Sequence, residues 1–513
     1  MTVTHNHQPS VQRNRTPPWI AVCHRWVETH AHFILAVMVL GWSGIFAVAA
    51  VYKLNSFWMG FDLGTHEQVL WNTIHGRIAA SSPSRGTNSY FGVDIIVTEL
   101  LFAPLYALWQ QPATLLVLQA LIVPLGSIPL YLLAVQLFES RTVGLAAAGL
   151  YLLALPVQYA TLYEFQIRLV GTVCFLWAFW ALEGRYGWRF MLFAALALGT
   201  RSDAGFALVG IGLYAALQRR GWRWSVLPMI GGFGWVLLCN AVLIPSIRSD
   251  SSTLYAFLYG WMGTTPTAML ETLITRPVFV WQHIATFGKA EYLLQLGGPL
   301  LFLFLLRPSI SMIALPSLLL NLLSADRIHW SIRYHYQAFV LPWLLLATLY
   351  AVAQLRQHPR TRRWWRPVLA LIILTTILSN LIWRSPLQTL ASRPRFPTRI
   401  ALLHNLLNRI PAGEPVAVSS QFGPFVARRQ GFFYFPGNIV YPKEYVERGH
   451  WLLVDRAEIP PDCLPRLAAL ADSEHWTTEY DQDGLMLLRN HNLAAPALLA
   501  DMPPCAAEPV EAR

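Results

Sequence analysis

Residues 33–51 read FILAVMVLGWSGIFAVAAV, a run that contains no ionisable side chain. Such a run is long enough to cross a bilayer as one helix. Hydrophobic residues make up 55% of the 513 in the chain and charged residues only 13%, whereas a soluble protein contains about a quarter charged residues. The sequence therefore predicts an all-α polytopic membrane protein.

Ten further apolar segments follow, at 96–110, 113–137, 143–160, 169–182, 190–217, 224–246, 292–306, 309–324, 338–355 and 367–383. The formal net charge is +11, and the arginines gather in short loops between these segments. This pattern is typical of cytoplasmic loops, and it accounts for the basic charge without nucleic acid as a partner. We expect a bacterial cytoplasmic-membrane protein with a cytoplasmic N-terminus and an outer C-terminus.

Placing every basic loop in the cytoplasm requires two adjustments to a simple count of spans. The segment 96–110 is short and follows Asp94, so we expect an interfacial or re-entrant helix on the outer side. The segment 190–217 would be about 42 Å long as one helix, so we expect a hairpin with Arg201 and Asp203 at its outer apex. One long tilted helix with a buried ion pair is the alternative. About eleven membrane segments result.

The chain divides into four predicted parts. These are a cytoplasmic tail at 1–30, a transmembrane domain at 31–385 with its first outer loop at 52–112, a small extracytoplasmic α/β domain at 395–500 and a disordered tail at 501–513. A helix-like stretch near 400–410 is followed by strand-like residues near 415–419, 451–455 and 484–488, and this alternation predicts the α/β domain. Cys463 and Cys505 could form a disulfide in an exported domain, but we expect two unpaired thiols.

Four polar groups of residues share the outer face in this topology. They are the loop at 61–68, the turn at 163–168, the hairpin apex and the stretch at 326–336. Together they supply the carboxylates of Asp62, Glu67, Asp94, Glu164 and Asp203, and the cationic side chains of Arg201, Arg333 and His335. Charges near a membrane are costly unless they are paired or used.

These residue types suit the transfer of a sugar from a lipid phosphate to a hydroxyl group. One carboxylate can act as the general base, and Asp62 is the strongest candidate because it begins the loop beside Gly64. The departing phosphate needs positive charge, which an arginine fork or a divalent cation can supply.

Structural alternatives exist for several of these residues. Glu67 and His66 could simply face solvent, and Asp203 could only neutralise Arg201. Arg333 and His335 could anchor the chain at the interface beside Trp330, Tyr334 and Tyr336, as aromatic belts do.

The loop residues resemble the opening signature of a known family. The signature comprises Phe61-Asp62-Leu63-Gly64, Gln68, Trp71-Asn72 and His75-Gly76-Arg77, and later motifs are Ala103-Pro104-Leu105-Tyr106, Ala314-Leu315-Pro316, Asn321-Leu322-Leu323-Ser324, Tyr334-His335-Tyr336 and Pro342. They resemble a family of predicted bacterial membrane proteins, domain of unknown function 2079, over about residues 45–455. That family looks like a branch of the GT-C superfamily of polytopic glycosyltransferases.

The resemblance implies roles for individual residues. GT-C enzymes use polyprenyl-phosphate sugars and carry an essential aspartate in the first extracytoplasmic loop, which would be Asp62 here. Glu164 would take the place of a second catalytic acid, and Arg201 would stand in for the lysine of a family Lys-Glu-Asp motif. The remaining candidates for substrate binding are Glu67, Asp94, Asp203, Arg333 and His335.

This chain departs from the family motifs at two places. Asp94-Ile95-Ile96-Val97 stands where the family commonly has His-Phe-Ser-Pro, and residues 163–168 read YEFQIR where it has Phe-Asp-Phe-His-Pro-Glu. Two histidines that could bind a metal are therefore missing. Asp94 and Glu164 could still coordinate a hard cation such as Mg²⁺ or Mn²⁺.

The sequence thus favours a membrane glycosyltransferase that acts on the outer face. Its partners would be a polyprenyl-phosphate-linked sugar, membrane lipids and an acceptor glycan, lipid or protein. A transporter or lipid-translocating protein is one alternative, suggested by the hairpin with its charged residues. A non-catalytic membrane scaffold that keeps the fold is another.

Overall fold

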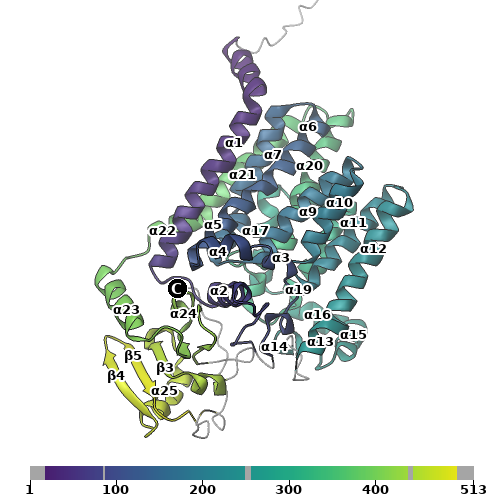
Figure 1. Ribbon diagram of the computed structural model, residues 1–513. Helices are drawn as coiled ribbons and strands as arrows, with labels where there is room; N and C mark the ends of the chain where they lie inside the picture. Colours follow the sequence, from purple (N-terminus) through teal and green to yellow (C-terminus); the bar gives the residue numbers. More distant parts are fainter. Residues whose placement is uncertain (1–17, 85–86, 249–255, 437–442, 494–498, 500–513) are drawn as a thin grey trace, which may run out of the picture.

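A bundle of long apolar helices forms the larger part of the molecule, and a small sheet lies beside one end of it (Figure 1). The computed structural model describes residues 18–84, 87–248, 256–436, 443–493 and 499. Helix α1 (Pro18–Asn55) runs along the outside of the bundle. We refer to the end of the bundle at which α1 finishes, at Asn55, as the site end, and to the opposite end as the basic end.

The first half of the chain is almost entirely helical. Its helices are α2 (Phe61–Ile74), α3 (Val97–Leu100), α4 (Ala103–Leu108), α5 (Pro112–Ile122), α6 (Ser127–Phe138), α7 (Arg141–Leu153), α8 (Leu155–Tyr163), α9 (Ile167–Glu183), α10 (Gly187–Leu198), α11 (Gly205–Leu217), α12 (Trp222–Leu237) and α13 (Ile244–Ile247). Short 3-10 turns lie at η1 (Tyr90–Gly92), η2 (Val123–Gly126) and η3 (Ser202–Ala204), and the η4 segment (Leu238–Leu243) is a π-helix.

Shorter helices dominate the next part of the chain. They are α14 (Ala256–Tyr259), α15 (Pro266–Thr275), α16 (Pro277–Ile284), α17 (Phe287–Gly297), α18 (Pro308–Ser311), α19 (Leu315–Leu323), α20 (Leu341–Gln357), α21 (Trp365–Ile382) and α22 (Pro386–Ala391). The 3-10 turns η5 (Gly298–Leu300), η6 (Leu303–Leu306), η7 (Met312–Ala314), η8 (Arg327–Trp330) and η9 (Tyr336–Phe339) connect them.

Five helical stretches among the described residues are long and apolar enough to cross a membrane. They are Val22–Asn55, Pro112–Phe138, Trp222–Ile247, Tyr336–Gln357 and Trp365–Ala391, and a sixth results if Arg141–Leu153 and Leu155–Tyr163, bent by 47°, form one broken span. This is fewer than the predicted eleven. Two prolines explain part of the difference. Pro299 and Pro308 divide residues 287–323 into short helices and 3-10 turns.

The N-terminal tail predicted at 1–30 is helical from Pro18 onward, where α1 begins. The carboxylate of Glu28 explains the longer helix. Its Oε1 accepts hydrogen bonds from the Ser140 hydroxyl (2.7 Å) and the Thr142 amide (2.9 Å), which lie at the start of α7. Glu28 thus fastens α1 to the loop between α6 and α7. Residues 1–17 and the tail predicted at 501–513 lie outside the described residues.

Residues 190–217 form a hairpin, as predicted. Helices α10 and α11 are separated by a break at residues 199–204, and the loops before α10 and after α11 meet at the basic end (Figure 1). Arg220 in the second loop pairs with Glu183 at the end of α9 at 2.6 Å. The segment predicted to be interfacial is only a 12-residue apolar stretch, Val97–Leu108, too short to cross a bilayer.

The C-terminal part contains a five-stranded mixed sheet in the order β2-β1-β3-β5-β4. Its strands are β1 (Val416–Val418), β2 (Phe432–Tyr434), β3 (Trp451–Asp455), β4 (Trp476–Gln482) and β5 (Leu485–Asn490), and its helices are α23 (Pro397–Arg409), α24 (Gly423–Val426) and α25 (Leu464–Ala471). The short 3-10 turns are η10 (Ser420–Phe422), η11 (Lys443–Arg448), η12 (Arg456–Glu458) and η13 (Pro461–Cys463). Strands β2, β1 and β3 are parallel, and β5 pairs antiparallel with β3 and β4. The predicted fold class, a helical membrane protein with a small α/β part, is confirmed.

One expectation for the C-terminal part is corrected. Cys463 is disulfide-bonded, so the expectation of an unpaired thiol at this position is wrong. Cys505 lies outside the described residues. A stable disulfide is typical of an oxidising compartment.

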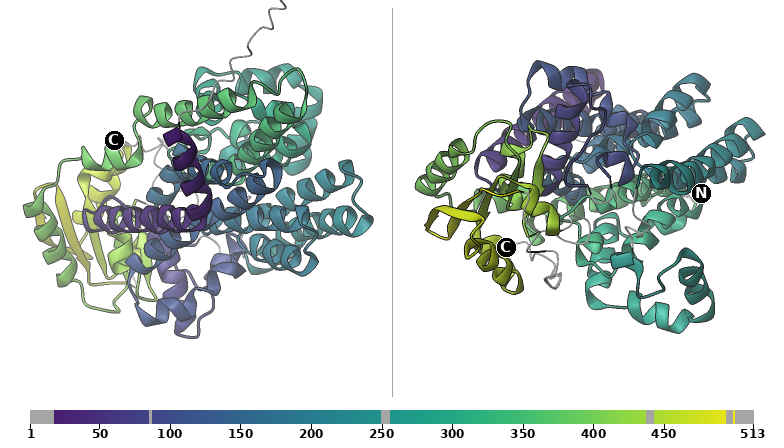
Figure 2. Two further views of the ribbon diagram at one scale, coloured as in Figure 1. Left: turned by 90° about the horizontal axis from the view of Figure 1, so that it is seen from above. Right: turned by 60° about the horizontal axis from the view of Figure 1, so that its bottom comes forward.

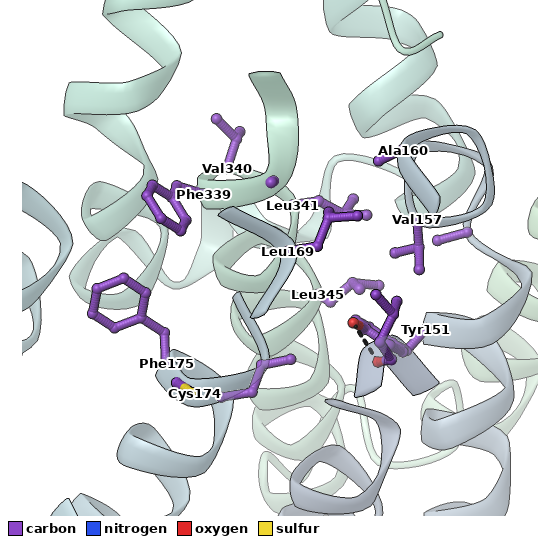
Figure 3. Close-up of a cluster of buried hydrophobic side chains, with 14 of the residues drawn as sticks. Tyr151, Val157, Ala160, Leu169, Cys174, Phe175, Phe339, Val340, Leu341 and Leu345 are labelled. Atoms are coloured by element: carbon purple, nitrogen blue, oxygen red, sulfur yellow. Dashed lines mark hydrogen bonds between the residues drawn. The ribbon is translucent and has the colours of Figure 1, made fainter. Parts of the chain in front are cut away.

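Apolar side chains from α7, α8, α9, η9 and α20 pack together in the middle of the bundle (Figure 3). Leu169 and Phe175 of α9 meet Phe339 and Leu341 of the η9–α20 segment in this cluster. Arg168 directly precedes Leu169 in α9, and Tyr336 begins η9, which ends at Phe339. The core therefore fixes the two segments that carry polar side chains at the site end.

The C-terminal sheet lies against α2, on the side of the bundle away from α10–α12 (Figure 2). Gln68 of α2 donates to the carbonyl of Arg429 at 2.9 Å. The hydroxyl of Tyr434 donates to the carbonyl of Phe61 at 2.6 Å. The packing is close at Gly64, where an added Cβ would lie 2.6 Å from the Tyr434 hydroxyl and 2.8 Å from the carbonyl carbon of Gly423.

We predict that Gly64→Ala lowers the stability of the protein by about 1–3 kcal/mol. The added methyl group must displace backbone at Gly423 and the Tyr434 hydroxyl, which is itself held by a hydrogen bond. Thermal unfolding in detergent measures the change. Gly44→Ala in α1 is the matched control, because nothing lies within 4 Å of its added Cβ. Equal melting temperatures for the two variants would contradict the prediction.

Candidate active site

The N-terminus of α2 is held by the carboxylate of Glu164. Oε1 of Glu164 accepts a hydrogen bond from the amide of Gly60 (3.0 Å), and Oε2 accepts one from the amide of Leu63 (2.7 Å). The first amides of a helix have no partners within it, and Gly60 offers no side-chain cap. Glu164 therefore caps α2 from the end of α8 and fixes the position of Asp62 in its first turn.

Asp62 is half-buried and hydrogen-bonded on one side. Its Oδ2 accepts a hydrogen bond from the amide group of Gln166 at 2.7 Å. Burial raises the pKa of Asp62, and the nearby charges of His66 and Arg201 limit the rise. Asp62 is thus a carboxylate in a protein-lined position whose affinity for a proton is increased, which is the property that a general base requires.

Glu164 and Asp62 influence each other directly. Burial raises the pKa of Glu164 to about 7, and the charge of Asp62 adds to the rise. The two amides of α2 oppose it. Of the two predicted catalytic acids, Glu164 is therefore occupied by the backbone of α2, whereas Asp62 accepts hydrogen bonds from the side chains of Gln166 and Tyr163.

A chain of alternating charges connects the hairpin apex to two other segments. Arg201 pairs with Asp94 at 2.8 Å and with Asp203 at 3.1 Å, and Asp203 also pairs with Arg168 at 3.1 Å. The second oxygen of Asp94 accepts a hydrogen bond from the amide of Ser202 at 2.8 Å. Asp94, Arg201 and Asp203, which are far from Asp62 in sequence, therefore lie in one cluster that extends to α9. Asp203 neutralises Arg201, as the structural alternative held.

Arg168 belongs to this cluster and was not among the predicted site residues. It lies in the first turn of α9 and is only 5% exposed. Its guanidinium carbon lies 5.2 Å from the centre of the Phe339 ring and 5.9 Å from that of Tyr336. The sequence did contain a signal for Arg168. It ends the predicted outer turn at 163–168, where a charged side chain is costly unless it is paired or used.

His335 is buried beside the same arginines. Its ring lies 4.2 Å from that of Tyr336 and 5.6 Å from that of Tyr163. Burial lowers the pKa of His335 well below its usual value, and Arg168 and Arg201 lower it further. Burial and these neighbouring charges therefore disfavour the cationic side chain that the sequence predicted at this position.

Arg333 does not join the cluster. Its side chain is exposed, and it forms no ion pair with any part of the chain that the structure describes. The neighbouring Tyr334 packs on Tyr163, with ring centres 5.2 Å apart. This placement agrees with the alternative in which Arg333 anchors the chain at an interface.

Glu67 and His66 are both buried in α2, so the alternative of solvent-facing side chains is wrong. Glu67 accepts a hydrogen bond from the hydroxyl of Tyr106 at 2.6 Å, and the guanidinium of Arg428 lies 3.9 Å away. His66 pairs with Glu99 at 2.8 Å. Glu67 thus lies where α2, α4 and the C-terminal part meet, and its contacts are internal ones.

The cluster does not provide a metal site. No group of three or more His, Cys, Asp or Glu side chains within the described ranges could hold a metal ion. The two carboxylates predicted as ligands have other partners: Asp94 pairs with Arg201, and Glu164 binds the amides of α2. Asp94 and Glu164 are therefore engaged by other groups in this structure, and the divalent cation stays a prediction.

We predict that Glu67→Gln reduces the pH dependence of stability. Burial raises the pKa of Glu67 from 4.5 to about 8, so the folded state binds the proton more tightly than the unfolded state. Stability that depends on this proton is present at low pH and is lost as the pH rises from about 4.5 to about 8.

Melting temperatures measured between pH 5 and pH 8 test this expectation. The slope should be smaller in Glu67→Gln than in the parent protein. Glu271→Gln is the control, because Glu271 is exposed in α15, and it should keep the slope of the parent. An unchanged slope in Glu67→Gln would show that Glu67 is ionised in the folded protein.

Two kinds of comparison find proteins similar to this chain. ArnT from Cupriavidus metallidurans bound to undecaprenyl phosphate is similar over 89% of this chain and 99% of that one, with 14% sequence identity and a TM-score of 0.44. The apo state of ArnT gives the same coverage and identity and a TM-score of 0.48. No curated protein matches the sequence. The family model described as predicted membrane protein (DUF2079) matches residues 51–487, so the chain belongs to this family.

Proposed function

We propose that this protein is a glycosyltransferase that moves a sugar from a polyprenyl-phosphate donor to an acceptor on the outer face of the bacterial cytoplasmic membrane. The observation that carries the proposal is the position of Asp62. A half-buried carboxylate, held by a capped helix and by Gln166, lies at the site end within the electrostatic influence of Arg201. This is the arrangement that a base needs to act next to a departing phosphate.

Two observations support an outer location for the site. The arginine-bearing loops that contain Arg141, Arg185 and Arg220 lie at the opposite end of the bundle (Figure 1), and such loops face the cytoplasm in most membrane proteins. The C-terminal part, which packs on α2, contains the disulfide-bonded Cys463. Disulfides persist mainly outside the cytoplasm.

The transfer step follows from these positions. The acceptor oxygen forms a bond to the anomeric carbon of the sugar, while the bond from that carbon to the phosphate oxygen breaks. Asp62 takes the proton of the acceptor hydroxyl, and the phosphate leaves with the electron pair of the broken bond. Glu164 acts as a positioning residue, because it holds the turn that carries Asp62.

The C-terminal part limits access to the base. Its η10–α24 segment packs so closely on α2 that an added Cβ at Gly60 would lie 2.2 Å from the carbonyl oxygen of Ser420. This segment therefore covers the start of α2 next to Asp62. This arrangement suits an acceptor that is itself exported or bound to the membrane.

We predict that Asp62→Asn lowers kcat for sugar transfer by about 10²–10⁴-fold, the usual contribution of a general base. Because burial raises the pKa of Asp62, transfer by the parent protein should also fall at low pH as this carboxylate gains a proton. The measurement uses purified protein, labelled polyprenyl-phosphate sugars and the pH profile of kcat/KM.

Asp472→Asn is the control, because Asp472 ends α25 in the C-terminal part. It should transfer at the rate of the parent. Equal transfer by Asp62→Asn and the parent would show that another group is the base. Uptake of the sugar lipid into liposomes without any covalent change would instead favour a transporter.

A further inference from the structure

Three buried polar side chains surround the ring of Tyr336, and each has one nitrogen without a hydrogen-bond partner among the residues that the structure describes. These are Nε of Arg168, Nδ1 of His329 and Nδ1 of His335. The three residues are 5%, 8% and 5% exposed. Buried polar atoms are nearly always satisfied in folded proteins. Three unsatisfied nitrogens in one place therefore point to a missing ligand.

The geometry around Tyr336 places these residues close together. The ring of His329 lies 3.8 Å from the Tyr336 ring, and that of His335 lies 4.2 Å from it. The guanidinium carbon of Arg168 lies 5.9 Å from the same ring. The residues come from α9 and from the η8–η9 segment, which the apolar core holds side by side.

The start of α9 adds positive character to this place. α9 is 17 residues long, and its N-cap residue Gln166 makes no side-chain capping bond because its amide group donates to Asp62. The helix dipole favours an anion at such an end. Arg168, the second residue of the helix, projects its guanidinium from the same turn.

The positive charges of Arg168 and Arg201 are balanced by two aspartates of the protein. Asp203 contacts both Arg168 and Arg201, and Asp94 contacts Arg201. Arg168 engages Asp203 through one terminal nitrogen, which leaves its Nε–H unused. The neutral imidazoles of His329 and His335 can each present one N–H group as well. The place therefore offers several donors, and no carboxylate occupies them.

We propose that Arg168, His329 and His335 form a buried subsite for an isoprenyl phosphate group, which is a phosphodiester in the sugar donor and a phosphate monoester after transfer. Resting on the proposed function, this subsite receives the phosphate of the lipid carrier. Arg201, Arg333 and His335 were expected from sequence to hold this phosphate. Of these, Arg201 is paired with two aspartates and Arg333 is exposed, so His335 is the one that the subsite retains.

The subsite lies next to the base. Gln166, which holds Asp62, is two residues before Arg168 in the chain. When the bond between the sugar and the phosphate breaks, the phosphate oxygen gains negative charge. Donors on Arg168 and on the two histidines stabilise that charge, since hydrogen bonds to an anion are stronger than those to a neutral group.

The test is binding of farnesyl phosphate, a short isoprenyl phosphate, to the full chain in nanodiscs. The double variant Arg168→Gln/Asp203→Asn removes the arginine together with its partner charge, so that the aspartate is not left without its second partner. We expect the double variant to bind farnesyl phosphate at least about tenfold more weakly than the parent, which is the size of one charge-assisted hydrogen bond. His335→Gln alone should weaken binding as well.

Arg327→Gln is the matched control, because Arg327 is an exposed arginine in the same segment as His329. It should bind as the parent does. Farnesol, which lacks the phosphate, should bind the parent and the double variant equally. Competition by inorganic phosphate alone would identify free phosphate as the source of the ligand, whereas competition only by the isoprenyl phosphate would identify the lipid.

Three results would overturn the subsite. They are parent-like binding by both the double variant and His335→Gln, a loss of binding in Arg333→Gln instead, and no preference of the parent for farnesyl phosphate over farnesol. If the double variant does not fold, His335→Gln and His329→Gln decide the question. Asp62→Asn should still bind farnesyl phosphate, so loss of transfer with intact binding separates a failure of the base from a failure of the subsite.

Discussion

The hydrogen bonds from the first turn of α2 to the carboxylate of Glu164 are the contact on which the site depends. They tie the end of α8 to α2, which is separated from α1 only by residues 56–60. Gly60, whose amide makes one of these bonds, also packs directly on the backbone of Ser420. One carboxylate therefore sets the position of Asp62 relative to the bundle and relative to the C-terminal sheet. Its buried position is tolerated because two amides satisfy it.

The other charged side chains at the site end are also compensated by partners within the protein. Desolvated charges are costly unless an opposite charge and hydrogen bonds compensate them. Asp94, Arg201, Asp203 and Arg168 alternate in sign along one chain of contacts, which runs from the segment before α3 to α9. The network closes the hairpin apex against α9 and against the segment before α3. It holds the site together because separating any pair would leave a charge unpaired in a protein environment.

Sequence patterns predicted the bundle and most of the polar cluster, because hydropathy and charge reflect costs that each segment meets on its own. The hairpin at 190–217 is an example, since two basic loops require an even number of crossings. What could not be predicted depends on distant parts of the chain. Residues 61–74 look like a polar loop, yet they form a buried helix because residues near Arg429, 361 positions after Gln68, cover it. Glu67 is buried for the same reason.

The departures from the family motifs are connected in the structure. Asp94 stands where the family commonly has a histidine, and Gln166 stands at a second such position. Asp94 pairs with Arg201, and Gln166 holds Asp62. Arg168 occupies the last position of the same motif, where the family has a glutamate, and it contacts Asp203. Replacing one of these residues alone would leave an opposing charge or a donor unmatched. The cluster therefore works as one electrostatic unit, in which guanidinium groups supply the positive charge beside the base.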